Sequence, residues 1–279
     1  MSLYKYFHPD RTDVLLNRSI RFSSPAVLND PFELKPHLAV LASPDCVAAA
    51  LRQAMPSLLE DEFSKLPIEQ RRLLSPEVLQ TLMVSQFSQT QKAVEDMAAH
   101  LIPGLQGVMA RKLEEQVGIL CLTESADNLL MWAHYADSHR GFVLEFDDCS
   151  PFFDCRVNLK DELRHLRKVT YSIKRPSLTL SEVDDFSAFM TKGLEWQYEA
   201  EWRMIQPLSS ASRIIGDGPE AIHLFEFPAE AIRGVILGAR MPEAKKVEIR
   251  GLLSQSPRYS HVRCVDARVD DEHYRVRVS

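Results

Sequence analysis

Disulfides, zinc fingers and membrane helices are the first features that the sequence argues against, because it contains little of what each needs. The 279-residue chain has five scattered cysteines, with no CxxC pair and no histidine at zinc-finger spacing. No run approaches the roughly 20 apolar residues of a membrane helix, and the N-terminal segment MSLYKYFHPDR lacks the apolar core of a signal peptide. We therefore expect a cytoplasmic protein with no disulfide, no bound metal and no membrane partner.

Neither positive nor negative charge is in large excess. The chain has 33 lysines and arginines and 39 aspartates and glutamates, for a formal net charge of −6, and neither sign forms a long run. Because sequence-independent nucleic-acid binding needs a basic surface, a nucleic-acid partner is not supported. The motifs GxSxG, GxxxxGK[ST] and GxGxxG are missing too, so serine hydrolases, P-loop NTPases and dinucleotide-binding Rossmann folds lose support.

What is present is the composition of an ordinary globular protein, 45% hydrophobic and 26% charged. The chain opens as strand, helix and strand over residues 3–7, 10–17 and 20–23, and turn-forming residues follow from 24 to 31. Further strands are expected at residues 117–122, 142–146, 168–172, 198–205, 222–227, 234–237, 262–265 and 274–278. Further helices are expected from residue 125 to 141 and near residues 181–194 and 242–253. These patterns predict a mixed α/β fold in one domain, residues 1–279.

Residues 43–116 differ in character from the rest of the chain. Ser43-Pro44 and Ser75-Pro76 each offer a helix N-cap followed by proline in the first turn. Apolar residues from 78 to 102 recur near helical spacing, and Pro103-Gly104 predicts the end of that helix. We expect this region to be a helical insertion or lid within the single domain.

The segment WQYEAEWRMI, residues 196–205, is the most informative for chemistry. If it is a strand, alternation places the core side chains on one face, namely Tyr198, Ala200, Trp202 and Met204. Glu199, Glu201 and Arg203 then share the other face, where the arginine favours an ionised carboxylate that could act as a base or stabilise a cation. The alternatives are a solvated strand or a helix with a Glu199–Arg203 ion pair.

Two further segments carry candidate ligand-binding residues. MWAHYADSHRG, residues 131–141, would place His134 and Tyr135 on one helix face next to Trp132, an arrangement that suits a planar ligand or a buried core. Ser23, Ser24 and Asn29 follow an early strand, where short polar side chains either bind a ligand or stabilise turns. Neither segment decides between these alternatives by itself.

Four ordered segments resemble a bacterial family known as domain of unknown function 2971: LYKYF, RFSSPAVLNDPFE, GILCLTESADNLLMWAHYADSHRGFVLEF and KGLEWQYEAEWRMI. Together they touch much of the chain between residues 3 and 205. The family name itself implies no activity.

A second resemblance is to ADP-ribosyltransferases, which open strand–helix–strand, carry small polar residues after an early strand and have an acidic ExE motif on a later strand. It implies an ADP-ribosyltransferase-like strand core, with Glu201 as the catalytic carboxylate and Glu199 orienting the acceptor. The chain departs from the pattern at Tyr4-Lys5-Tyr6, where those enzymes usually place arginine or histidine, and in having Ser-Ser-Pro in place of Ser-Thr-Ser. The ligand-binding residues that the patterns and this resemblance nominate are Tyr6, Ser23, Ser24, Asn29, Trp132, His134, Tyr135, Lys192 and Arg203.

The expected function is therefore binding of a nucleotide-like small molecule, with NAD as the suspected cofactor for ADP-ribose transfer or NAD cleavage in a bacterial defence or toxin system. One alternative is a non-catalytic nucleotide-binding or sensor module. The other is a metal-dependent nuclease or hydrolase that uses Asp30, Glu33, Glu199 and Glu201, which would have to converge on one ion.

Overall fold

The computed structural model describes residues 1–35, 37–40, 43–73, 76–179 and 186–278. Contacts between Cα atoms divide the chain into two compact units. Unit 1 comprises Met1–Lys35, Arg111–Arg175 and Phe186–Ser279, and unit 2 comprises Pro36–Ala110 and Pro176–Asp185. The expectation of one domain with a lid stays a prediction.

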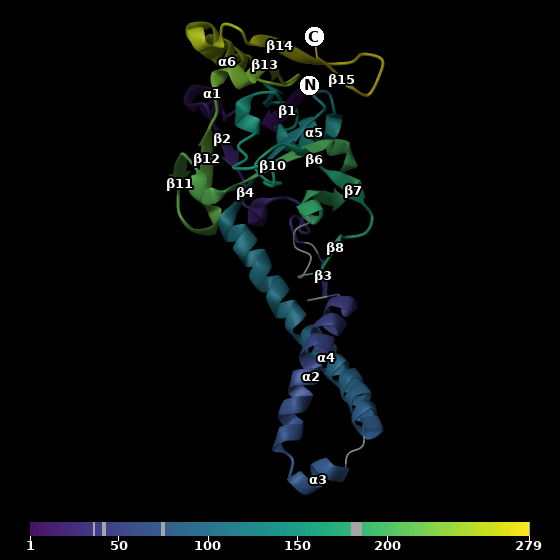
Figure 1. The fold of residues 1–279 in the computed structure, drawn as a ribbon. Helices are drawn as coiled ribbons and strands as arrows, with labels where there is room; N and C mark the ends of the chain where they lie inside the picture. Colours follow the sequence, from purple (N-terminus) through teal and green to yellow (C-terminus); the bar gives the residue numbers. More distant parts are fainter. Residues whose placement is uncertain (36, 41–42, 74–75, 180–185, 279) are drawn as a thin grey trace. The chain divides into compact units, whose positions relative to one another are not determined.

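Unit 1 is built on an eight-stranded mixed sheet (Figure 1). In sheet order its strands are β15 (Val276–Val278), β14 (Arg263–Val269), β13 (Ile232–Leu237), β5 (Phe142–Asp147), β1 (Ser2–Phe7), β4 (Val117–Thr123), β10 (Glu201–Pro207) and β6 (Arg167–Lys168). All neighbours are antiparallel except β13 and β14. Those two are joined by helix α6 (Glu243–Gln255), because parallel strands need a long crossover connection. The expected mixed α/β class is confirmed.

Smaller sheets accompany the large one. Unit 1 also contains a three-stranded sheet of β11 (Arg213–Ile215), β12 (Ile222–Glu226) and β2 (Ser19–Phe22), and a pair of β7 (Thr170–Ser172) with β9 (Thr191–Gly193). Its other helices are α1 (Asp13–Asn17) and α5 (Leu129–Tyr135), with single 3₁₀ turns at Pro25–Val27, Pro151–Phe153, Phe186–Met190, Leu194–Glu199, Leu208–Ser210, Gly218–Glu220, Ala229–Ala231 and Pro257–Tyr259.

Unit 2 is mostly helical. It contains α2 (Pro44–Lys65), α3 (Ile68–Leu73) and most of α4 (Pro76–Gln116), with a strand pair of β3 (His37–Val40) and β8 (Ser177–Thr179). The expected end of a helix at Pro103 is wrong, because α4 continues through it to Gln116. A proline removes one backbone hydrogen bond and disfavours a helix, but a long helix can continue through it because its other backbone hydrogen bonds remain.

Alternating apolar residues explain why the large sheet forms. The core of unit 1 gathers side chains from one face of its central strands, including the fully buried Leu3, Leu120, Leu144 and Val235. Helix α6 adds Ile249 and Leu253 to this core. A second, smaller cluster forms around Trp132.

The ends of two expected elements differ from the sequence pattern. The helix expected from residue 125 is only α5, capped by the Asn128 side chain, and it is followed by three residues with positive φ, Asp137, Ser138 and His139. In the region expected as a helix near residues 181–194, residues 180–185 lie outside the described part, and the rest forms a 3₁₀ turn and β9.

The strand expected over residues 198–205 begins later than its alternation suggests. Leu194–Glu199 is a 3₁₀ turn, Ala200 adopts a left-handed conformation with φ 43°, and β10 starts at Glu201. Alternation was therefore right for Glu201 and Arg203 but not for Glu199, because the turn at Ala200 breaks the pleat between the two glutamates. Glu199 reaches the same surroundings from the turn.

Candidate functional site

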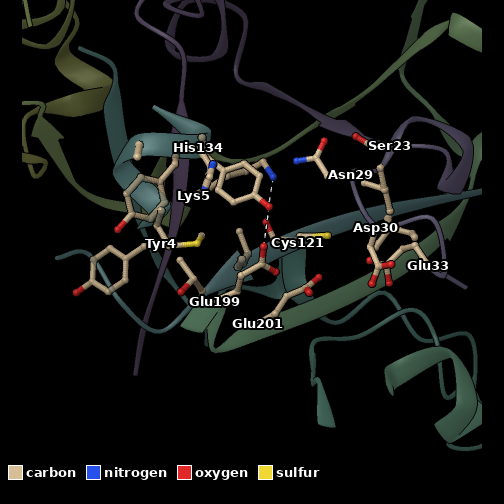
Figure 2. Close-up of a pocket in the computed structure, with 18 of the residues that line it drawn as sticks. Tyr4, Lys5, Ser23, Asn29, Asp30, Glu33, Cys121, His134, Glu199 and Glu201 are labelled. Atoms are coloured by element: carbon tan, nitrogen blue, oxygen red, sulfur yellow. Dashed lines mark hydrogen bonds between the residues drawn. The ribbon is translucent and has the colours of Figure 1, made fainter. Parts of the chain in front are cut away.

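A cavity of about 600 Å³ opens in unit 1 beside the central strands (Figure 2). Its walls come from β1, the segment 23–33, β4, α5 with the residues after it, and three side chains around the start of β10. In Figure 2 Glu199 and Glu201 lie in the lower middle of the view, and Ser23, Asn29, Asp30 and Glu33 lie to their right. The cavity thus joins segments that are far apart in the sequence.

Strand register explains why these segments meet. Thr123 of β4 is paired with Tyr4 of β1 on one side and with Glu201 of β10 on the other. An antiparallel bridge between Ser23 and Ile119 ties the end of β2 to β4. Residues separated by almost two hundred positions are therefore held in one row across three strands.

A buried ion cluster forms the acidic side of the cavity. Arg203 binds Glu201 through two hydrogen bonds, Nε to Oε1 at 2.6 Å and Nη2 to Oε2 at 2.9 Å. Lys192 Nζ lies 2.6 Å from Glu199 Oε2 and 3.2 Å from Glu201 Oε2, and 3.6 Å from Glu33 Oε2. These side chains are at most 8% exposed, so each charge depends on its partners rather than on water.

The positions of these charges set opposite pKa shifts in two glutamates. Burial by itself raises the pKa of Glu201, but Arg203 and Lys192 outweigh burial and hold it below the ordinary value, so Glu201 is ionised at neutral pH. Burial dominates at Glu33 and raises its pKa despite Arg203. Arg203 Nη2 is 2.6 Å from Glu33 Oε1, yet this oxygen has no well-aligned hydrogen bond among the described residues. Glu33 is therefore the less well accommodated carboxylate.

Two tyrosines hold the glutamates in place. Tyr135 donates a hydrogen bond to Glu199 Oε1 at 2.6 Å, and burial together with this carboxylate raises the pKa of the phenol. The backbone N–H of Glu201 donates to the Tyr171 hydroxyl at 2.8 Å, and burial raises the pKa of Tyr171 to about 12. Both tyrosines stay neutral at physiological pH and act as fixed hydrogen-bonding groups.

Most residues nominated from the sequence border the cavity. They are Tyr6, Ser23, Asn29, His134, Tyr135, Lys192, Glu199 and Glu201. Their roles in binding or catalysis stay predictions, since bordering a cavity is a statement of position only.

Three nominated residues, Trp132, Ser24 and Arg203, do not border the cavity, so the expectation that Trp132 forms its wall is wrong. Trp132 is fully buried, packs edge-to-face on Tyr6 and donates its indole N–H to the Ala126 carbonyl, so the apolar face of α5 belongs to the core. Ser24 caps the turn Pro25–Val27 and donates to the Glu114 carbonyl. Arg203 is also fully buried, behind Glu201.

Lys5 and Cys121 are among the residues that border the cavity and that the sequence analysis did not nominate. Lys5 Nζ donates to the Cys121 carbonyl at 2.9 Å, and burial lowers the lysine's pKa. A lysine inside an otherwise aromatic strand was a usable signal, because lysine is rarely buried without a reason. Cys121 sits within an apolar strand, and nothing in its sequence surroundings distinguishes it from a core residue.

A metal site built from the four carboxylates is disfavoured by Lys192. Its ammonium group already lies among Glu33, Glu199 and Glu201, where it supplies the positive charge that a metal ion would bring. Within the described residues, the group whose potential ligand atoms lie close together is Asp147, Asp148 and Cys149, which is at the surface and apart from the cavity lining.

The comparisons with known proteins concern part of this site. The model of a family described as "Protein of unknown function (DUF2971)" matches residues 131–204. The matched segment includes most of α5, Lys192, Glu199 and Glu201, so the first expected resemblance is confirmed where much of the cavity wall is formed.

The other comparisons add no relative. No curated protein and no solved structure matches the chain. Among the helices in the part of the chain that the structure describes, none combines the length and hydropathy that crossing a membrane requires.

Proposed function

We propose that unit 1 binds a nucleotide-like ligand in the cavity and uses NAD as an ADP-ribosyltransferase-like enzyme, with Glu201 as the catalytic carboxylate. The observation that carries the proposal is the row Tyr4, Thr123 and Glu201 across three strands, which brings an ionised carboxylate to a cavity bordered by Ser23. This agrees with the order of motifs that ADP-ribosyltransferases display along their chains.

The proposed chemistry follows from the charge of Glu201. When the bond between nicotinamide and ribose breaks, positive charge develops on the ribose, and an ionised carboxylate beside it lowers the energy of that transition state. Glu199, fixed by Tyr135 and Lys192, would orient the group that attacks the ribose. Water as the attacking group gives NAD cleavage, and a hydroxyl or amine gives ADP-ribose transfer.

A second candidate, a binding module without catalysis, is favoured by one specific observation. Both Glu201 oxygens already accept hydrogen bonds, from Arg203 and from Lys192. The positive charges of Arg203 and Lys192, at such short range, offset the negative charge of Glu201 that would stabilise a cationic transition state. In this case the ion cluster holds the cavity wall, and the ligand is only recognised.

One experiment separates the candidates. The purified protein is incubated with NAD, nicotinamide release is followed, and NAD binding is measured by calorimetry for the wild type and for Glu201→Gln. Glu195→Gln is the matched control, because Glu195 is exposed and does not border the cavity.

Each outcome has a distinct meaning. Release that is lost in Glu201→Gln while this variant still binds NAD, and that is kept in Glu195→Gln, supports the enzyme. Binding without release supports the binding module. If the wild type neither binds nor cleaves NAD, the assignment of this ligand fails.

A further inference from the structure

A smaller cavity of about 270 Å³ adjoins the main one and has the opposite electrostatic character. The two cavities share Lys5, Tyr6, His8 and Ser23 in their linings. The smaller one is bordered in addition by Phe7, Arg11 and Arg21, and by none of the acidic residues. We call this space, with Lys5, His8, Arg11 and Arg21 in its walls, the basic annex.

Two cations of the basic annex, Lys5 and Arg21, form no ion pair with the described residues, although Glu201 attracts Lys5 from a greater distance. Within the described residues, the Arg21 guanidinium makes no hydrogen bond or ion pair, and the Lys5 ammonium group bonds only to the Cys121 carbonyl. An ammonium group has three donors, so two of those of Lys5 stay open. The other two basic residues have nearby acids: Arg11 pairs with Asp13 at 2.8 Å, and His8 lies 3.7 Å from Asp137.

The like charges of Lys5, Arg11 and Arg21 lie close enough in the basic annex to act on one another. Burial, and next to it the like charge of Arg11, lower the pKa of Arg21. Burial also lowers the pKa of Lys5. Half-buried cations that lie near one another in a cavity and form no ion pair are a typical arrangement where an anionic group binds.

We propose that the basic annex is an oxyanion subsite that takes a phosphate or diphosphate group of the ligand whose remaining part fills the main cavity. The inference rests on the proposed ligand cavity but not on the proposed transfer chemistry. It specifies a phosphorylated ligand over a neutral nucleoside. It also orients that ligand, with its anionic group at Lys5 and Arg21 and its other end toward Glu199 and Glu201.

The test uses inorganic pyrophosphate as the probe and the full chain at low ionic strength. Calorimetric titration of the wild type should show binding that weakens as salt is added. Arg21→Gln should weaken pyrophosphate binding roughly 10- to 100-fold, the range expected for losing hydrogen bonds to a charged group. Arg258→Gln is the matched control, because Arg258 is an exposed arginine that borders neither cavity.

The unliganded variants provide an independent measurement. Because Arg21 has no ion-pair partner and is repelled by Arg11, Arg21→Gln should melt at the wild-type temperature or above it. Pyrophosphate should then raise the melting temperature of the wild type but not that of Arg21→Gln. If Arg21→Gln does not fold, Arg11→Gln replaces it, with a weaker loss of binding expected because Arg11 is shared with Asp13.

The outcomes distinguish this proposal from the proposed function. Pyrophosphate binding that depends on Arg21 but not on Glu201, in a protein that releases no nicotinamide from NAD, supports the basic annex and contradicts the transferase. Absence of pyrophosphate binding by the wild type, or equal binding by Arg21→Gln and Arg258→Gln, overturns the basic annex whatever the result with NAD.

Discussion

Lys192 is the cation on which three buried carboxylates converge, so its removal is the sharpest test of the ion cluster. Lys192→Met keeps most of the side-chain volume and removes the charge. At an effective dielectric constant of about 20, the contacts at 2.6 Å and 3.2 Å correspond to attractions of roughly 6 and 5 kcal/mol. Much of this offsets the cost of taking the ammonium group out of water.

The net effect follows from what the substitution leaves behind. Glu199 and Glu201 would remain buried with fewer partners, and breaking a buried pair in this way costs about 3–5 kcal/mol of unfolding free energy. For a domain of this size the loss lowers the melting temperature by roughly 6–20 °C. Lys112→Met, which breaks an exposed pair with Glu115, is the control and should cost less than about 1 kcal/mol.

The pH dependence has a definite sign. The folded protein raises the pKa of Lys192, because its three carboxylates outweigh burial. The stabilisation is therefore fully present below the ordinary lysine pKa of about 10.4 and is lost as the pH rises through the folded-state value. The stability gap between the wild type and Lys192→Met should be wide at pH 7 and narrow in strongly alkaline solution.

Thermal melting at pH 7, with far-ultraviolet circular dichroism, measures the effect. The double variant Lys192→Met with Glu199→Gln should recover part of the lost stability, because it removes one unpaired carboxylate. If Lys192→Met melts within the range of the Lys112→Met control, the cluster contributes nothing net and the reasoning is refuted.

Three further predictions concern the same unit. Glu201→Gln should lower the free energy of unfolding by about 3–5 kcal/mol, because Arg203 loses its buried charged partner. Glu33→Gln should lower it much less at neutral pH, because the raised pKa of Glu33 means that its ionisation opposes folding there. Urea unfolding at pH 5 and pH 7 compares the two variants, and equal losses of stability would contradict the assignment. Trp132→Ala should lower the free energy of unfolding by about 3–5 kcal/mol, because it leaves a cavity in the core. A melting curve measures this loss, and an unchanged melting temperature would contradict core packing. Gly141→Ala should greatly reduce the yield of folded protein, because the added Cβ would lie 1.9 Å from the Phe7 carbonyl oxygen; soluble expression at the wild-type level would show that the backbone yields there.

Local sequence patterns were sufficient for most of the strands of unit 1. Alternation and apolar runs predicted β1, β4, β5 and β13 to within about two residues, because buried strands of a central sheet carry a strong local signal. The match of residues 131–204 to the DUF2971 family was also visible in the motifs. Boundaries set by single backbone conformations were not predictable, as the turn at Ala200 and the passage of α4 through Pro103 illustrate.

The site itself was only half determined by the sequence. The pairing of Glu201 with Arg203 was readable from their spacing, since the two lie two residues apart on one strand. The surroundings of Lys5, Lys192 and Arg21 depend on the pairing of strands that are far apart in sequence. This pairing puts Lys192 among three carboxylates and leaves Lys5 and Arg21 with no ion pair among the described residues. Trp132 lies on a helix face that, from its sequence, could either bind a ligand or pack on the core. Its contact with Tyr6 of the neighbouring strand decides for the core. Tertiary structure decides these cases because the energy of a charged or aromatic side chain depends on its partners and burial, which local sequence does not specify.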